Sequence, residues 1–418
     1  MFILKLLIFL ALLLFPFGEL LRFDTGNNIT IKPLDFVVGL AALWWVIYKV
    51  KNAKFRMQNK NIFVLPFIAF VSVGLISLII NLSWLKPQQF WVSAFYLFRF
   101  VAYTLLFPIV WQFDQPFKKK IVKFLFIDGL LLVFLGFLQY FFFNSLKSFY
   151  YLGWDEHMHR IFSTFFDPNF AGAFYVLYVL FVAGILYKNF QNRHTDMSRI
   201  RIMESLMLPR MTVAWILSFV LAISLIAVFL TFSRAAILML IFGALIFFTL
   251  INKKRLIIFL VGLILLFIII ASPKFYDENM NLFREASSKA RIVNYEFALR
   301  VIKDHLLIGV GFNTYRYAKL EYGIRERMDM PSHADAGVDN SFLFVLATTG
   351  IIGFVAYIWM WIVILKKALF LHKKRRSMAA IVVVSSIFAI FINALFINSL
   401  FFAPLMLWMF MIIGLMED

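Results

Sequence analysis

The sequence predicts an all-α, polytopic membrane protein with about twelve transmembrane helices and a large periplasmic loop between the ninth and tenth spans. Of the 418 residues, 63% are hydrophobic and 15% are charged, whereas a soluble domain is closer to half apolar and a quarter charged. The apolar residues occur in runs of roughly 17 to 23, the length that crosses a bilayer core ~30 Å thick. Phenylalanine alone supplies 54 residues, too many for the interior of a soluble protein of this size.

The spans follow one another along the whole chain, which we treat as a single membrane domain, 1–418. The first predicted span has no small-residue cleavage site, so we interpret it as a retained helix rather than a signal peptide. Only Asn398 and Ser399 separate the last two spans, which alternatively form one re-entrant hairpin. The predicted spans are 2–17, 34–50, 62–80, 90–112, 121–143, 169–187, 212–230, 235–251, 256–272, 341–365, 378–397 and 400–416.

Lysine and arginine alternate between the connections. The connections after the even-numbered spans are rich in both residues, whereas the short odd-numbered ones are poor in them. This positive-inside pattern predicts that both termini are cytoplasmic. It also explains the formal charge of +19 without a nucleic-acid partner. The basic stretches are 49–60, 118–120, 188–210, 253–255 and 366–376.

Two long connections lie on the predicted outer side. Residues 273–340 contain equal numbers of acidic and basic residues together with aromatic ones, which indicates a small folded helical cap rather than a disordered loop. Residues 144–168 form a second outer loop that contains His157 and Arg160. Because polar side chains gather there, we expect the functional site at the outer face. The chain has no cysteine, which excludes thiol nucleophiles and Cys-bound metal, and we find no acidic cluster that predicts a metal site.

A helix is predicted over 287–305, within the large outer loop. On a helical wheel Arg291 falls on the apolar arc, which we expect to be buried, whereas Arg300 falls on the solvated arc. A buried guanidinium needs a carboxylate or a phosphate partner, so Arg291 is either in an internal ion pair or a ligand for an anion. The other members of the predicted buried arc are Ala298, Ile302, Tyr295, Leu299 and Ile292.

Two further arginines lie at or within the predicted spans. Arg234 is at the outer boundary between the seventh and eighth spans, where it either extends to the interface or binds an anionic ligand, the interpretation we favour. Arg99 lies near the middle of the fourth span. An intramembrane charge marks an internal ion pair or a pathway, and the sequence leaves these alternatives open.

Asp167, Pro168 and Asn169 open the sixth span. Asp at the N-cap and Pro in the first turn are typical of a helix start, and we favour this interpretation of Asp167. The N-terminus of a helix also attracts anions. Asp339 and Asn340 open the tenth span, and capping again explains Asp339. Gly350 and Gly353 follow within that span and indicate close helix packing. In the preceding loop, His333 is a group that titrates near neutrality.

Four segments resemble the O-antigen ligase and polymerase superfamily, bacterial membrane enzymes that act on lipid-linked glycans. They are RIFSTFFDPNFAGAF at 160–174, LTFSRAA at 230–236, ARIVNYEFALRVIKDHLLIGVGFNTY at 290–315 and VDNSFLFVLATTGIIG at 338–353. Their order, the twelve spans and the large outer loop extend the resemblance over most of the chain.

One position departs from the family pattern. Ligases of the family carry a His followed by Asn, Ser or Gln, then nine residues and Gly-x-x-Gly. Here Asn340, Gly350 and Gly353 keep the spacing, but Asp339 stands in the His position. In the ligases this His is thought to take part in activating the acceptor, so either Asp339 replaces it or His333 reaches in. A polymerase is therefore at least as well supported as a ligase.

The resemblance implies glycosyl transfer from an undecaprenyl-diphosphate-linked donor to a glycan or lipid A-core acceptor, at the outer face of the bacterial inner membrane. Asp339 or His333 would be the catalytic base, no cofactor is required, and the partners are these substrates and membrane lipids. A flippase for lipid-linked oligosaccharides and a non-catalytic scaffold are the alternatives. The residues expected to bind the diphosphate or the sugars are Arg234, Arg291, Arg160, Asn169 and Asn340.

Overall fold

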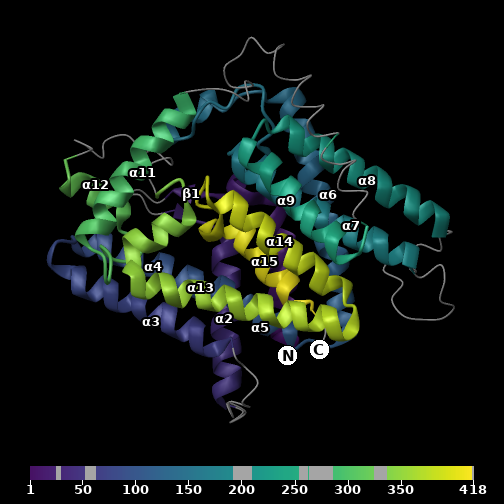
Figure 1. The fold of residues 1–418 in the computed structure, drawn as a ribbon, viewed down its shortest axis with the longest axis horizontal. Coiled ribbons are helices and arrows are strands. Elements are labelled where there is room, and N and C mark those ends of the chain that lie inside the picture. Colours follow the sequence, from purple (N-terminus) through teal and green to yellow (C-terminus); the bar gives the residue numbers. More distant parts are fainter. Residues whose placement is uncertain are drawn as a thin grey trace.

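The computed structural model is an all-helical membrane protein, as the sequence predicts (Figure 1). It describes residues 1–24, 30–51, 63–191, 210–253, 262, 286–323 and 337–416. Among these residues the only strands are β1 (Phe23–Asp24) and β2 (Thr30–Ile31), a short antiparallel pair in the first outer connection.

Eight described helical stretches are long and apolar enough to cross a membrane, and three shorter apolar helices accompany them. Together these account for eleven of the twelve predicted spans, and the ninth, 256–272, lies outside the described residues apart from Gly262. The helices are α1 (Phe2–Leu14), α2 (Pro33–Lys51), α3 (Val64–Ile80), α4 (Pro87–Thr104), α5 (Leu106–Trp111), α6 (Gln115–Phe142), α7 (Pro168–Gln191), α8 (Arg210–Leu230), α9 (Arg234–Leu250), α13 (Ser341–Arg375), α14 (Met378–Ala394) and α15 (Ala403–Gly414).

Helix α7 is the central element of the bundle. It packs against α8, α9 and α14, and it is the most completely buried of the long candidate spans among the described residues. Aromatic rings fill the core beside it: Phe174 meets Trp408 of α15 edge to face, with ring centroids 5.0 Å apart. Such contacts add to the area that each ring buries. Because all faces of α7 are covered, both of its ends are fixed relative to the surrounding helices.

Helix α13 is broken at Gly350, which has φ +64° and ψ −171°. The chain at 306–311 docks into this break through backbone hydrogen bonds, from Val310 N–H to the Ala347 carbonyl (3.0 Å) and from Ile351 N–H to the Leu306 carbonyl (2.9 Å). A Cβ atom on Gly350 would stand 2.2 Å from the Leu307 carbonyl oxygen. At Gly350 the close packing predicted from the glycines is therefore an attachment of residues 306–311 to α13.

Residues 286–323 and 143–167 contribute to hydrophobic clusters separate from the main core. Helices α11 (Ala286–Asp304) and α12 (Tyr315–Glu321) pack on the first turns of α13, and Figure 1 shows them at the end of the bundle away from both termini. The connection 143–167 contains η3 (Lys147–Leu152) and η4 (Ser163–Phe165), two 3-10 helices, beside a cluster of Leu146, Trp154 and Phe162.

The buried face of α11 differs from the one predicted. Phe297, Ala298 and Val301 are buried, whereas Ile292 and Leu299 are 55% and 56% exposed. The prediction for Ile292 and Leu299 is therefore wrong: the buried arc is rotated, and Arg291 lies at its edge, half-buried. The reason is that α11 packs the Phe297 ring against Tyr315 of α12, with ring centroids 5.3 Å apart.

Candidate functional site

The candidate site lies where α11 meets the starts of α7, α9 and α13. The first residues of α7 and α9 are joined directly, because the Ser233 hydroxyl donates to the Asn169 side-chain oxygen at 3.0 Å. Gly172 makes this approach possible, since a Cβ atom there would stand 2.7 Å from Cβ of Ala236. Asn169 and Arg234, two residues predicted for the site, are therefore held on neighbouring helix starts.

Arg160 fixes the turn that presents Arg234. Its side chain is 3% exposed, and Nε–H donates to the Thr231 carbonyl at 2.8 Å. Gln139 of α6 holds the same loop: its Nε2 donates to the Arg160 carbonyl (3.2 Å), and its Oε1 accepts from Phe162 N–H (2.8 Å). Arg160 thus connects the outer loop to the 231–233 turn that precedes Arg234.

Asp167 caps α7, as predicted. Its Oδ1 accepts the backbone N–H of Asn169 at 2.6 Å and that of Phe170 at 3.3 Å, which satisfies two of the amide groups that a helix start leaves open. The cap directs the side chain of Asn169 towards Ser233, the N-cap of α9.

Arg234 and Arg291, 57 positions apart in the chain, are brought together by the fold. They are close enough that the positive charge of Arg291 acts on the Arg234 guanidinium. Within the described residues, no Asp or Glu oxygen lies within 4.0 Å of the Arg291 side chain; the ion pairs found there involve Lys5, Arg22, Lys32 and Arg99. Two like charges at the edge of an apolar bundle repel each other, so this end of the molecule favours an anion.

Asn340, rather than Asp339, caps α13. The Asn340 Oδ1 accepts from Phe342 N–H (2.9 Å) and Leu343 N–H (3.0 Å), while Nδ2 donates to the Leu395 carbonyl (3.2 Å). The prediction of a capping role for Asp339 is therefore wrong. Asparagine is as good an N-cap as aspartate, and with Asn340 in that role the Asp339 carboxylate is available for other contacts.

The Asp339 carboxylate lies against α11. Asn294 Nδ2 donates to its Oδ2 at 3.2 Å. The Tyr295 hydroxyl lies 2.9 Å from the Asp339 carbonyl oxygen and 2.8 Å from the Leu395 carbonyl oxygen, which share its one proton. Burial raises the pKa of the Asp339 carboxyl above its ordinary value, opposed by the Asn294 hydrogen bond and by the charges of Arg291 and Lys319. A desolvated carboxylate with a raised pKa is a stronger proton acceptor.

Sequence reasoning missed three residues of this cluster: Asn294, Tyr295 as a polar contact, and Lys319. Lys319 is 8% exposed and its ammonium lies 5.4 Å from the centre of the Tyr315 ring. Their positions in the sequence gave one usable signal, since Asn294 and Tyr295 stand one turn of helix after Arg291. Lys319 gave none, because a lysine in a polar loop segment is usually solvated.

His333 lies outside the described residues, so its place relative to Asp339 stays a prediction. Arg99 is in an internal ion pair, the first of the two alternatives: its Nε lies 3.2 Å from Oδ1 of Asp35. Within the described ranges, no three His, Asp or Glu side chains lie close enough to share a metal ion.

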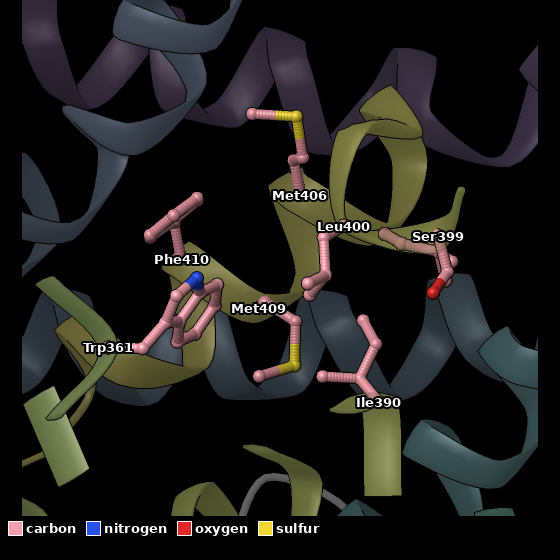
Figure 2. Close-up of a pocket in the computed structure, with 8 residues that line it drawn as sticks. Trp361, Ile390, Ser399, Leu400, Met406, Met409 and Phe410 are labelled. Atoms are coloured by element: carbon pink, nitrogen blue, oxygen red, sulfur yellow. The ribbon is translucent and has the colours of Figure 1, made fainter. Parts of the chain in front are cut away.

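The two best-formed cavities found in the described part of the chain lie elsewhere. One is a narrow apolar gap between α13, α14 and α15, with no room for a water-sized group; Figure 2 shows Trp361, Ile390 and Met409 among the residues that line it. The other lies at the opposite end of α7 and is described below. The candidate site is defined here by its polar residues.

Fold and site together define a polytopic membrane protein with a cluster of cationic and carboxylate groups at one membrane boundary. Residues 219–358 match the family model described as O-Antigen ligase. This match agrees with the predicted resemblance to the O-antigen ligase and polymerase superfamily and indicates a role in membrane glycan biosynthesis. The matched region contains Arg234, Arg291, Asp339 and Asn340 but not Arg160. No curated protein matched the chain.

Proposed function

We propose that this protein is a membrane glycosyltransferase that polymerises or ligates undecaprenyl-diphosphate-linked saccharides at the outer face of the bacterial inner membrane. Its acceptor is a growing glycan or a lipid A-core. The observation that carries the proposal is the cluster of Arg234, Arg291 and Asp339. Arg234 begins α9, Arg291 lies on α11 and Asp339 directly precedes the N-cap of α13, and all three lie inside the region that matches the ligase family.

The arginines act on the leaving group. As the acceptor hydroxyl attacks the anomeric carbon, the bond from that carbon to the diphosphate oxygen breaks, and the diphosphate leaves with the bonding electrons. Its developing charge is stabilised by charge-assisted hydrogen bonds from Arg234 and Arg291. Attack from the face opposite the diphosphate inverts the anomeric centre. The donor is already activated, so neither a nucleotide nor a metal is needed for this step.

Asp339 acts on the acceptor. Its carboxylate takes the proton that the acceptor hydroxyl loses, and its desolvated position next to Asn294 supports this role. His333 is the alternative base, and a pH–rate profile distinguishes the two. With Asp339 as the base, activity falls at acid pH, with an apparent pKa above that of an ordinary carboxyl group, and the Asp339→Gln variant loses that dependence.

Three further residues hold the elements that carry the site: Arg160, Asn169 and Asn340. Arg160 holds the turn before Arg234, Asn169 joins α7 to α9 through Ser233, and Asn340 fixes the start of α13 next to Asp339. We propose that these residues position the groups that contact the diphosphate and the sugars, with any direct contact to the sugars coming from Asn169 at the edge of the cluster.

The direct test is the length and amount of surface glycan made in cells that carry Arg234→Ala or Arg291→Ala. We expect both variants to lose long chains while protein levels stay normal, because loss of one such donor costs on the order of 10²–10³ in rate. Arg300→Ala is the matched control, since Arg300 is an exposed arginine on the same helix as Arg291. Unchanged glycan in both site variants would refute the proposal.

A transport assay separates transferase from flippase. Purified protein in liposomes is given labelled lipid-linked oligosaccharide and an acceptor, and both bond formation and movement across the bilayer are measured. We expect new glycosidic bonds. Movement of the labelled lipid without bond formation would instead support a flippase, although the pairing of Arg99 with Asp35 offers little embedded charge for a central pathway.

A further inference from the structure

A second polar feature lies at the other end of α7. Pro168 begins α7 at the candidate site and Lys188 lies in its last turn, so about 20 residues, or roughly 30 Å of helix, separate the two. This is about the thickness of a bilayer core. The Lys188 end of α7 therefore lies at the membrane boundary opposite the candidate site, near the end of α15.

A cavity of about 110 Å³ opens at this boundary. Its volume is several times the ~10–15 Å³ that one buried water requires. The starts of α6 and α14 and the ends of α7 and α15 form its walls, so two of the four helices point their N-termini at it, and a helix N-terminus favours negative charge. The residues that line it include Lys118, Lys119, Lys188, Phe181, Val382 and Ile412.

The cavity is basic at its mouth and apolar inside. Three lysines line it, Lys118 and Lys119 from the first turns of α6 and Lys188 from α7. Lys118 is only 7% exposed, and its ammonium lies 5.6 Å from the centre of the Trp111 ring. No acidic residue is among the described residues that line the cavity.

The apolar wall continues from these lysines towards the membrane interior. It is formed by Phe181, Val382 and Ile412, from α7, α14 and α15. Gly184 lets α7 and α14 meet closely at this wall, since a Cβ atom there would stand 2.3 Å from Val382 Cγ2. A ligand that satisfies both parts needs an anionic head and a hydrocarbon tail.

We propose that this cavity is a binding site for an anionic phospholipid. The phosphate of the lipid lies between Lys118, Lys119 and Lys188, and its acyl chain lies along Phe181, Val382 and Ile412. Basic pockets between helices at a membrane boundary recognise anionic headgroups in this way. This site is independent of the proposed transferase chemistry, because it lies a bilayer thickness away from Arg234 and Arg291.

Native mass spectrometry of the full-length protein in detergent tests the proposal. Phosphatidylglycerol and phosphatidylcholine with the same acyl chains are titrated separately. We expect phosphatidylglycerol to bind more tightly. The preference should fall about fivefold for Lys119→Gln and on the order of 100-fold for the triple Lys118→Gln, Lys119→Gln and Lys188→Gln variant.

The matched control replaces three basic residues outside the cavity, Lys120→Gln, Lys373→Gln and Lys374→Gln, and should bind phosphatidylglycerol as the unmodified protein does. Ala379→Leu narrows the cavity without changing charge and should also weaken binding. Equal binding of both lipids, equal loss in the control, or full displacement by an equal concentration of inorganic phosphate would overturn the proposal. If the triple variant does not fold, Lys119→Gln and Ala379→Leu decide the outcome.

Discussion

Two regions of this protein place an arginine next to the apolar bundle. They differ in whether a neighbouring acidic residue pairs with the arginine. Between α2 and α4, the Arg99 guanidinium lies 3.2 Å from Asp35, and the Tyr103 hydroxyl donates to the same carboxylate at 2.6 Å. At the candidate site, Arg291 faces another arginine, Arg234, and in the described residues it forms no ion pair. The first cluster pairs its arginine with an acid, whereas in the second, among the described residues, Arg291 pairs with no acid and lies near a second positive charge.

A second cluster near the first region follows the same rule. Glu19, which is 4% exposed, is in ion pairs with Lys32 and Arg22. The pair with Lys32 joins the segment after α1 to the start of α2, whereas Arg22 is three residues from Glu19 on the same side. Glu19 neutralises one of the two positive charges, so we interpret these pairs as structural contacts in the connection between α1 and α2.

The largest effect expected from this comparison is on stability. Asp35→Ala leaves the Arg99 charge inside the bundle without its partner. Breaking a buried pair costs about 3–5 kcal/mol, and we expect the lower end of that range because the two side chains are 20% and 24% exposed. Thermal unfolding in detergent measures it, with Glu296→Ala, an exposed acid on α11, as the control. The paired change Asp35→Leu with Arg99→Met should recover most of the loss. If Asp35→Ala unfolds like the control, the contrast between the two regions does not hold.

The next largest effect is a loss of activity without a loss of stability. Arg291→Ala relieves the repulsion with Arg234, so we expect thermal unfolding to be unchanged or slightly later, while glycan transfer falls on the order of 10²–10³. Measuring both quantities on the same preparation sharpens the comparison, because a structural arginine loses both together. A large drop in unfolding temperature would show that Arg291 has a structural role, like Arg99.

Asp339→Asn should likewise lower activity without lowering stability. Burial raises the pKa of Asp339, so the folded protein holds the proton more tightly than the unfolded chain does. Ionised Asp339 therefore costs stability, and its favourable contribution, present below the ordinary carboxyl pKa, is lost as pH rises through the raised pKa. At neutral pH we expect the variant to be as stable as the unmodified protein or more so, with activity about 100-fold lower. A destabilised but active variant would contradict the role as base.

The smallest effect concerns the neighbouring residue. Asn340→Ala removes the cap of α13, which should cost about 1 kcal/mol of stability and leave the rate of transfer per folded molecule within a few fold. Asn340→Ser and Asn340→Asp, which also cap helices, should recover the stability. Loss of activity at full stability would show that Asn340 contacts substrate directly.

The sequence by itself determined the spans of this protein and the segments that carry its site. A run of apolar residues long enough to cross a bilayer is a local property, because every backbone group in the span must be satisfied within its own helix. This is why eleven predicted spans match apolar helices. The Asp167 cap was equally local, since its partners are the next two or three residues.

The tertiary structure decided which charges meet. It turned α11 so that Phe297, not Leu299, is buried, set Arg291 beside Arg234, and paired Arg99 with Asp35. It also made Asn340 the N-cap of α13, while the Asp339 carboxylate accepts a hydrogen bond from Asn294. The physical reason is that each of these contacts joins residues far apart in the chain, and their partners are fixed by how whole helices pack rather than by the pattern within any one of them.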